Sequence, residues 1–317
     1  MRIGKRSFGN GLLAVCPAAD GVAAAVVRRE HGVPPSLDLC QFFPTPDHTD
    51  ARQAAVNRMV KDGGFNRIAC TSALDLNAYS LMLVEAPDVP KAELAGAMRW
   101  RVKDLLDFSV DEAVIDFFEV PAQKGSDRSR QVFVVAARAS VIKQRAELLL
   151  DAGLKLTAID IPELCLRNVT ALLPEDVGGV AFVYLARNQG LITLTRQATL
   201  YFSRRLQAGT EILWQQQADT VTPEIEGWLD SVVIEVQRSL DYYESHFTVP
   251  PIAGLVLGPL GRPVAGVAEY LKSQLGLPCR VLDLNELIDV RGKLSPEMQV
   301  RCLPAIAAAL RTEVRPA

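Results

Sequence analysis

Cysteine and histidine are the residue types in this chain that could bind a transition metal or supply a nucleophile. The six cysteines stand at positions 16, 40, 70, 165, 279 and 302, and no two of them form a C-x-x-C pair. The three histidines, His31, His48 and His246, are scattered along the chain. Protein zinc sites are recognised in sequences by closely spaced ligand pairs. The sequence therefore predicts no metal site and six reduced thiols, most of them buried.

The common catalytic motifs are absent as well. The chain has no G-x-x-x-x-G-K-[ST] phosphate loop, no G-x-S-x-G nucleophile turn and no H-E-x-x-H zinc motif. Its 34 basic and 37 acidic residues give a net charge of −3, which leaves no basic surface for nucleic acid. We therefore expect no nucleic-acid partner.

The composition indicates a folded chain with a sizeable core. Of its 317 residues, 49% are hydrophobic and 22% are charged, which allows one large domain or two of ordinary size. The basic start, MRIGKRSFGN, is not followed by an apolar stretch of signal-peptide type. No run of about 18 apolar residues is present either. We therefore expect a cytoplasmic chain that reaches a membrane only through partners.

Hydrophobic patterning predicts alternating strands and helices in the first half of the chain. A hairpin turn is expected at residues 17–21, and the proline-bounded stretch 87–90 marks a break. The predicted strands are 12–15, 22–28, 37–43, 67–71, 78–84, 111–120, 131–137 and 156–161, and the predicted helices are 51–61, 91–106, 140–152 and 162–172.

The second half repeats this organisation after a junction at residues 174–179. Each half runs through three strands, a helix, a strand and a helix, which is the duplicated α/β architecture of the actin, Hsp70 and sugar-kinase superfold. The polar stretch 215–222 is predicted to be a loop. The predicted strands are 180–185, 191–196, 198–204, 252–257 and 280–282, and the predicted helices are 231–247, 264–275 and 295–310.

Three stretches of the chain resemble the family of PilM-like pilus assembly proteins. The most specific is AMRWRVKDLLDFSVDEAVIDFFEVP at 97–121, which is closest to the MshI branch that serves mannose-sensitive haemagglutinin pili. EVQRSLDYYESHF at 235–247 is similar to the family's long helix, and LPAIAAALR at 303–311 is similar to its C-terminal helix. Their order and spacing agree over nearly the whole chain.

The resemblance implies an α/β chain with the duplicated actin-like (ASKHA) fold, in which two RNase H-like domains carry one inserted small α/β subdomain. The first actin-like half would span residues 1–175, with the inserted subdomain at about 87–135, and the second half would span 176–317. The C-terminal helix, at 295–311, is expected to pack back on the first half.

The resemblance also implies a function. PilM-like proteins lie in the cytoplasm, bind the N-terminal tail of a single-span inner-membrane partner of the PilN type, and join the assembly platform to cytoplasmic motor components. We therefore expect an adaptor of a type IV (MSHA-like) pilus machine, held at the periphery of the bacterial inner membrane by its partners.

Actin-like ATPases hold phosphates and magnesium with two Asp-x-Gly turns, and this chain departs from both. Laid on that pattern, Cys16 stands at the first carboxylate position and Ala18 at the glycine, with Pro17 between them. In the second turn, Tyr184 stands at the carboxylate position and Ala186 at the glycine. A thiol does not replace a carboxylate for a hard cation, and proline removes an N–H donor. The resemblance therefore implies no ATP hydrolysis and no cofactor, with ATP and Mg²⁺ the disfavoured alternative.

Five residues remain as candidates for a degenerate nucleotide site. Asp20 and Gly21 follow the first turn, Gly209 follows the second-half strands, and Gly258 and Gly261 flank Pro-Leu where the family has a Gly-Gly turn for adenosine. Each also has a structural explanation, since Asp-Gly pairs commonly form hairpin turns. If they bind a nucleotide, weak adenine binding without phosphoryl transfer is expected.

Five residues of the expected insertion are candidates for binding a partner: Trp100, Arg101, Phe108, Phe117 and Phe118. Trp and Arg are enriched at binding hot spots, and neighbouring strand residues such as Phe117 and Phe118 point to opposite faces. Alternatively, the tryptophan and the two adjacent phenylalanines form the core of the insertion.

Three other functions stay open at this stage. The chain could be an active ATP-binding ATPase or nucleotide-controlled switch of the same machine, although that function needs the acidic turns. It could be a GspL-like component of type II secretion, a system whose cytoplasmic protein has a related fold. It could also form actin-like filaments, which requires self-complementary surfaces.

Overall fold

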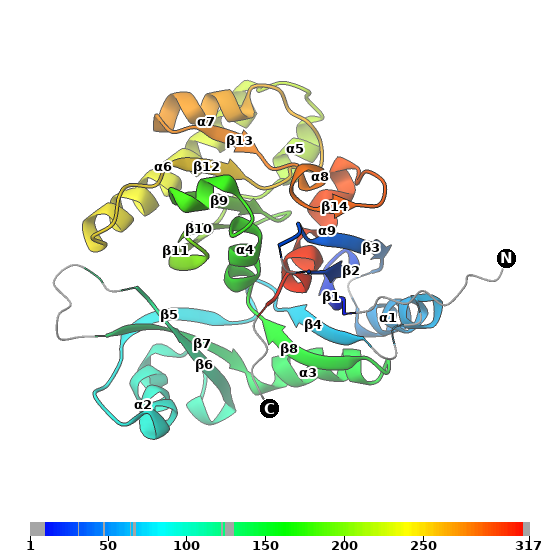
Figure 1. Ribbon diagram of the computed structural model, residues 1–317, viewed down its shortest axis with the longest axis vertical. Coiled ribbons are helices and arrows are strands. Elements are labelled where there is room, and N and C mark those ends of the chain that lie inside the picture. Colours follow the sequence, from blue (N-terminus) through cyan, green and yellow to red (C-terminus); the bar gives the residue numbers. More distant parts are fainter. Residues whose placement is uncertain are drawn as a thin grey trace.

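The computed structural model describes residues 10–30, 32–46, 48–63, 65, 68–121, 123 and 130–312. Its strands form three sheets of six, five and three strands. The three sheets lie in separate lobes, with helices α4 and α9 in the middle between the two larger ones (Figure 1).

The first sheet has the strand order β14-β3-β2-β1-β4-β8. Strands β1 to β3 form an antiparallel meander, and β4 and β8 extend it parallel to β1. Helices α1 and α3 cover one face, towards which Leu13 and Val15 point. The elements are β1 (Leu12–Ala18), β2 (Gly21–Arg28), β3 (Ser36–Pro44), α1 (Thr49–Gly63), β4 (Ala69–Ala73), α3 (Ala139–Leu150), β8 (Lys155–Asp160) and β14 (Asp289–Val290).

The second sheet repeats this arrangement with the order β11-β10-β9-β12-β13. Again a meander of three antiparallel strands is extended by two parallel ones. The duplication predicted from the sequence is therefore confirmed. The elements are β9 (Val180–Leu185), β10 (Gly190–Arg196), β11 (Thr199–Leu206), α5 (Glu211–Gln216), α6 (Pro223–His246), β12 (Gly254–Leu257), α7 (Val267–Leu275), β13 (Cys279–Val281) and α8 (Leu284–Leu287).

The third sheet is inserted in the chain between β4 and β8. It is antiparallel with the order β5-β7-β6, and its strands are β5 (Ser80–Glu85), β6 (Ala113–Glu119) and β7 (Gln131–Arg138). Helix α2 (Lys91–Val102) covers one face with Leu94, Met98 and Val102, and single 3₁₀ turns follow at Lys103–Leu105 and Val110–Glu112. The sheet thus spans 80–138, whereas the sequence placed the insertion at about 87–135.

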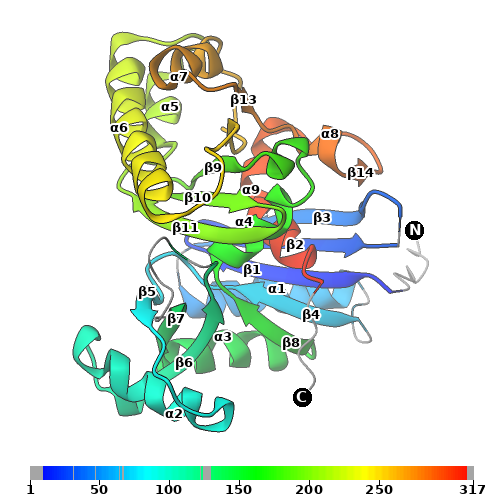
Figure 2. The ribbon, with the colours of Figure 1, turned by 60° about the vertical axis from the view of Figure 1, so that its left-hand side comes forward.

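Helices α4 (Pro162–Thr170) and α9 (Pro296–Ala309) lie side by side between the two larger sheets (Figure 2). Helix α9 contacts β1 to β4 of the first sheet. The cluster that these elements share contains many small side chains where the helix meets the strands, so that the backbones approach closely. Its small members are Ala14, Cys16, Ala23 and Ala25 of the strands and Ala305, Ala307, Ala308 and Ala309 of the helix.

The long helix of the second half begins earlier than predicted. Helix α6 starts at Pro223, whereas the sequence pattern placed its start at residue 231. Thr222 caps it, because its hydroxyl accepts a hydrogen bond from the Ile225 N–H, and proline is well suited to the first helical position. Helix α5 also occupies the start of the stretch 215–222 that was predicted to be a loop.

None of the helices in the described ranges combines the length and the apolar character that crossing a bilayer requires.

The small side chains under α9 predict that a larger residue there destabilises the fold. Ala25 is fully buried in the cluster that contains α9, so Ala25→Leu has no room for its added carbons. Overpacking of this kind lowers the free energy of unfolding by about 1–3 kcal/mol. Urea unfolding followed by circular dichroism measures the loss.

The matched change Ala95→Leu, on the exposed side of α2, should leave stability nearly unchanged. Equal midpoints for the two variants would contradict the close packing.

Candidate functional site

A cavity of about 270 Å³ lies between the first and second sheets. Both sheets and both central helices contribute to its walls. The lining residues are 16–19 and 23 of the first hairpin, 73–76 after β4, Pro162, Cys165 and Leu166 of α4, 184 and 186–189 around the β9–β10 turn, and Arg301, Pro304 and Ala307 of α9. The two segments that the sequence aligned with phosphate-binding turns therefore meet at this cavity.

The first of these turns presents a thiol and a proline to the cavity. Cys16 is 4% exposed, and burial raises the pKa of its thiol to about 12. The thiol therefore stays neutral at pH 7, and a neutral thiol is a poor ligand for a hard cation such as Mg²⁺. Pro17 follows directly and has no backbone N–H to offer an anion.

Prolines recur around the cavity. Pro162 stands at the first position of α4, where backbone N–H groups would otherwise suit an anion, and Pro304 lies inside α9. Pro17 and Pro162 thus remove an N–H group from two of the five segments that form the wall, whereas an N–H group inside α9 would bond within the helix in any case. Phosphate sites depend on such converging N–H groups. The wall is therefore poorly suited to phosphate.

The second turn places a phenol where the family pattern has a carboxylate. Tyr184 is half-buried in β9, and burial raises the pKa of its hydroxyl well above the usual value, so the group is uncharged. Its hydroxyl has no hydrogen-bond partner among the described residues. Ala186 follows at the cavity wall. The β9 side of the cavity therefore presents a neutral phenol and a methyl group where the family pattern has a carboxylate and a glycine, and the polar residues 187–189 follow in the turn.

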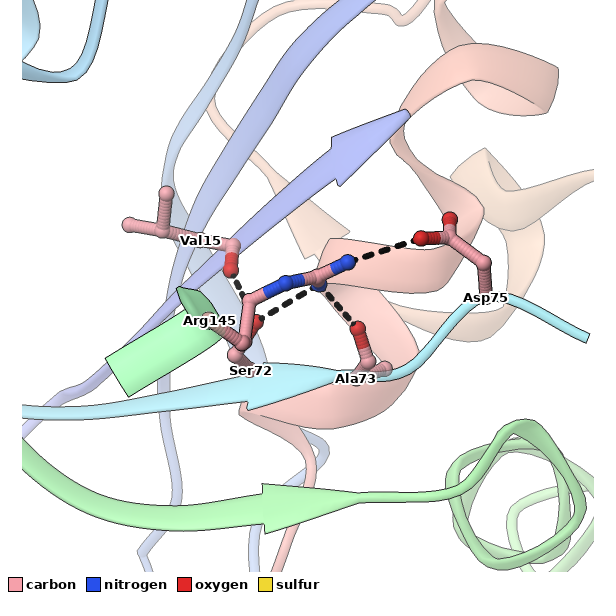
Figure 3. A network of polar contacts seen from close by, with 5 residues as sticks. All are labelled: Val15, Ser72, Ala73, Asp75 and Arg145. Carbon is pink, nitrogen blue, oxygen red and sulfur yellow. Dashed lines mark hydrogen bonds and ion pairs between the residues drawn. The ribbon is translucent and has the colours of Figure 1, made fainter. Parts of the chain in front are cut away.

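Asp75 is the one carboxylate among the described lining residues, and the sequence analysis missed it. Its Oδ2 accepts a hydrogen bond of 2.8 Å from Arg145 Nη2 of α3 (Figure 3). The same guanidinium donates through Nη1 to Ala73 O and to Ser72 Oγ, and the Ser72 hydroxyl donates to Val15 O at 2.6 Å. The carboxylate is therefore engaged in an ion pair, and Arg145 ties α3 to the ends of β1 and β4.

The cations at the rim of the cavity are paired too. Arg187 makes a two-point contact with Glu211, at 3.0 and 3.1 Å. Arg301 pairs with Glu297 at 2.9 Å, and its guanidinium lies 4.5 Å from the centre of the Phe42 ring. Within the described ranges, no group of three or more His, Cys, Asp or Glu side chains could hold a metal ion. The lining therefore offers neither a free carboxylate nor a free cation to a magnesium-bound phosphate.

The candidates Asp20 and Gly21 lie beside the cavity and do not line it. The hairpin turn is Ala19–Asp20, so Gly21 already belongs to β2. A Cβ at Gly21 would lie 2.5 Å from Phe43 O and as close to the Phe42 ring. The glycine is therefore required by the packing of β3, not by a phosphate or by the turn itself.

The other three glycines support the second sheet. A Cβ at Gly209 would lie 2.2 Å from Arg187 O, where the chain after β11 crosses the β9–β10 turn. Gly258 donates its N–H to Val183 O at 2.8 Å, and Gly261 has a positive φ of 82° and packs against Trp214. None of the three lines the cavity.

A second hollow of about 390 Å³ lies between the third sheet and the second half of the chain. Strand β5 forms one side and β11 the other, and each is an edge strand of its sheet. Sequence patterning could not find this groove, because its two sides come from segments more than a hundred residues apart. The lining residues are Ser80, Leu81, Leu83, Phe133, Glu163, Phe202, Ser203, Arg205 and Tyr242.

A polar cluster closes one end of this groove. Glu163 is 1% exposed, and its carboxylate accepts a hydrogen bond of 2.5 Å from the Tyr79 hydroxyl. Arg205 of β11 donates to Tyr79 O at 2.6 Å and lies 5.0 Å from the centre of the Tyr79 ring. Three parts of the molecule therefore meet here: the start of the insertion, α4 and β11.

The partner-binding candidates do not form one surface. Trp100 is 75% exposed on α2, and Arg101 beside it pairs with Glu85 at 3.6 Å. Phe117 is half-buried beneath α2, in the core of the insertion. The alternative that Trp100, Phe117 and Phe118 form the core of the insertion is thus wrong for Trp100.

The remaining two candidates have aromatic or cationic neighbours. The Phe118 ring lies 5.3 Å from that of Phe133, on the sheet face that looks towards the groove. Arg138 lies 4.3 Å from the centre of the half-buried Phe108 ring, at the opposite end of the insertion. Only Phe118 is therefore adjacent to the groove.

A family model described as type IV pilus assembly protein PilM matches residues 49–226, which is more than half of the chain. The match includes the stretch 97–121 and leaves out the stretches 235–247 and 303–311. No curated protein sequence matches the chain.

Two solved structures with TM-scores above 0.5 show the same fold. A chain of a PilM–PilN type IV pilus biogenesis complex has a TM-score of 0.70 and 22% identity, over 94% of this chain and 97% of that chain. The cytoplasmic domain of EpsL, an inner-membrane component of the type II secretion system of Vibrio cholerae, has a TM-score of 0.51 and 11% identity. The alignment covers 96% of this chain and 100% of that domain. A protein of unknown function with an actin-like ATPase fold, from Bacteroides thetaiotaomicron, has a TM-score of 0.47 and 8% identity, over 91% and 96%. The actin-like fold predicted from the sequence is confirmed.

The buried carboxylate at the end of the groove predicts a pH dependence. Burial raises the pKa of Glu163, so the folded protein holds this proton more tightly than the unfolded chain. Its stabilising contribution is complete below the unfolded pKa of about 4.3 and is lost as the pH rises through the folded value. The free energy of unfolding of the natural protein, relative to Glu163→Gln, should therefore fall as the pH rises above about 4. Urea titrations of the two proteins measure this difference. A difference that rises with pH would contradict the assignment.

Proposed function

Because the chain belongs to the PilM family of type IV pilus assembly proteins, we propose that it is a cytoplasmic adaptor that docks a membrane partner's tail without hydrolysing ATP. The observation that carries this proposal is the apolar cavity at the place of the phosphate turns. Cys16, Pro17 and Tyr184 occupy positions where an actin-like ATPase needs carboxylates and N–H groups. Phosphoryl transfer requires a positioned metal and an in-line nucleophile. The described lining residues offer no set of side chains that would bind the metal or position the nucleophile.

The partner is an inner-membrane protein of the PilN type. The similarity to a chain of a PilM–PilN complex supports this proposal. We place the docking site in the groove between β5 and β11. Each of these strands pairs with a described neighbour on one side only, so an extended segment can add to either edge by backbone hydrogen bonds.

The groove fits an extended, mainly apolar segment. Leu81 and Leu83 alternate along β5 and line the groove, whereas Met82 and Val84 between and after them pack under α2. Phe133 and Phe202 add aromatic surface, and this is the residue type that anchors interfaces. A tail with apolar side chains at alternate positions would fill these places.

A second surface remains for a cytoplasmic motor component. Trp100 is exposed on α2, on the sheet face away from the groove, with Arg101 next to it. Trp and Arg together are typical of binding hot spots. One partner in the groove and another on α2 would make the insertion the link between membrane and motor.

The finer assignment to the MshI branch rests on residues 97–121 and is part of this proposal. A role in type II secretion, as for EpsL, has only the shared fold in its favour.

The docking proposal is tested with a synthetic peptide of the cytoplasmic N-terminal tail of the PilN-like partner. Leu83→Glu places a charge in the groove and should weaken peptide binding by at least about tenfold, measured by isothermal titration calorimetry. The matched control is Leu150→Glu on α3, where the leucine is 52% exposed and far from the groove. It should leave the dissociation constant unchanged.

Trp100→Ala completes the test by separating the two surfaces. We expect it to leave peptide binding intact. If Trp100→Ala weakens the peptide and Leu83→Glu does not, the tail binds on α2 and the groove assignment is wrong. If the natural protein binds no peptide at all, the adaptor function itself is contradicted.

A further inference from the structure

The cavity between the two larger sheets has a chemistry that suits a ligand other than a nucleotide. Its walls are mostly alanine, leucine, proline and cysteine side chains, and they come from both halves of the chain. An adaptor that holds a peptide in a separate groove does not need this space. A ligand of this cavity would therefore be independent of the docking function.

Every charged group at the cavity has a partner of opposite charge. Asp75 is held by Arg145 at 2.8 Å. Arg187 is held by Glu211 at 3.0 Å, and Arg301 by Glu297 at 2.9 Å. A charged ligand would have to leave water and compete with these partners for a counter-ion. The lining therefore selects for uncharged molecules.

Two neutral polar groups are left for a ligand. Tyr184 and Gln189 both line the cavity, and neither side chain has a hydrogen-bond partner in the part of the chain that the structure describes. A hydroxyl can donate and accept, and an amide can do both as well. These two groups can orient a ligand that is otherwise apolar.

The size of the cavity limits the ligand further. Apolar cavities of about 150 Å³ are large enough for benzene. At about 270 Å³, this cavity has room for an aromatic ring with a short substituent. We propose that the cavity between the two larger sheets binds an uncharged, mostly apolar small molecule of this size, whose polar group bonds to the Tyr184 hydroxyl and the Gln189 amide.

Such a ligand would contact both halves at once. Cys16 and Leu76 belong to the first half, whereas Tyr184 and Ala186 belong to the second. Binding stabilises the arrangement that provides both walls, by linkage. The small molecule would thus hold the two halves together.

The probe for this site is 4-ethylphenol, which is uncharged at neutral pH because phenols titrate near pH 10. We expect one molecule to bind per chain by isothermal titration calorimetry. Tyr184→Phe removes only the hydroxyl and should weaken binding about fivefold. Ala186→Phe fills the cavity and should reduce binding by at least about tenfold. The matched control is Tyr270→Phe, whose hydroxyl bonds to Asp230 on the outer helices, and it should bind as the natural protein does.

Four results would overturn the proposal. The first is an absence of binding, and the second is equal binding by Ala186→Phe, once circular dichroism shows that this variant is folded. The third is an equal loss in Tyr184→Phe and Tyr270→Phe. The fourth is tighter binding of phenyl phosphate than of 4-ethylphenol, because the cavity would then be an anion site. If Ala186→Phe does not fold, the affinities of Tyr184→Phe and Tyr270→Phe for 4-ethylphenol still test the proposal.

Discussion

Helix α9 lies against the first sheet through alanine and cysteine side chains, which leave the helix backbone close to the strands. Because the same helix also packs on α4, and α4 packs on the second sheet, this contact sets the spacing between the two halves. Larger side chains at Ala25 or Ala307 would push the layers apart. The width of the cavity between the sheets therefore follows from a row of small residues that do not themselves perform any chemistry.

We propose that the cavity stands at the position of a nucleotide site whose chemistry has changed. The fold still brings the ends of β1, β4 and β9 together at the point where actin-like proteins hold phosphates. The side chains there are a neutral thiol, a neutral phenol and prolines, and the remaining carboxylate, Asp75, is bound by Arg145. In the function that we propose, the partner binds in the groove beside the inserted sheet. The binding site for the partner then lies away from this cavity.

The sequence was sufficient for the duplicated fold, because two sets of three strands, a helix, a strand and a helix are visible in its periodicity. It also identified Cys16, Pro17 and Tyr184, which line the cavity. It did not show the groove or the Arg145–Asp75 pair, because both depend on contacts between segments far apart in the chain. Asp75 carried a usable signal, since a polar residue just past a buried parallel strand often faces a ligand site. The prediction for Gly21 was misleading, because a glycine that is needed for close packing against β3 cannot be told from a turn glycine in the sequence.

The central claim is that this cavity no longer holds a magnesium nucleotide. Equilibrium dialysis of the purified protein against radiolabelled ATP with Mg²⁺ tests it most directly. The account predicts no stoichiometric binding at nucleotide concentrations up to about 1 mM, which corresponds to a binding free energy weaker than about −4 kcal/mol. One nucleotide bound per chain with a dissociation constant in the micromolar range would contradict it, and would make the protein a nucleotide-controlled switch.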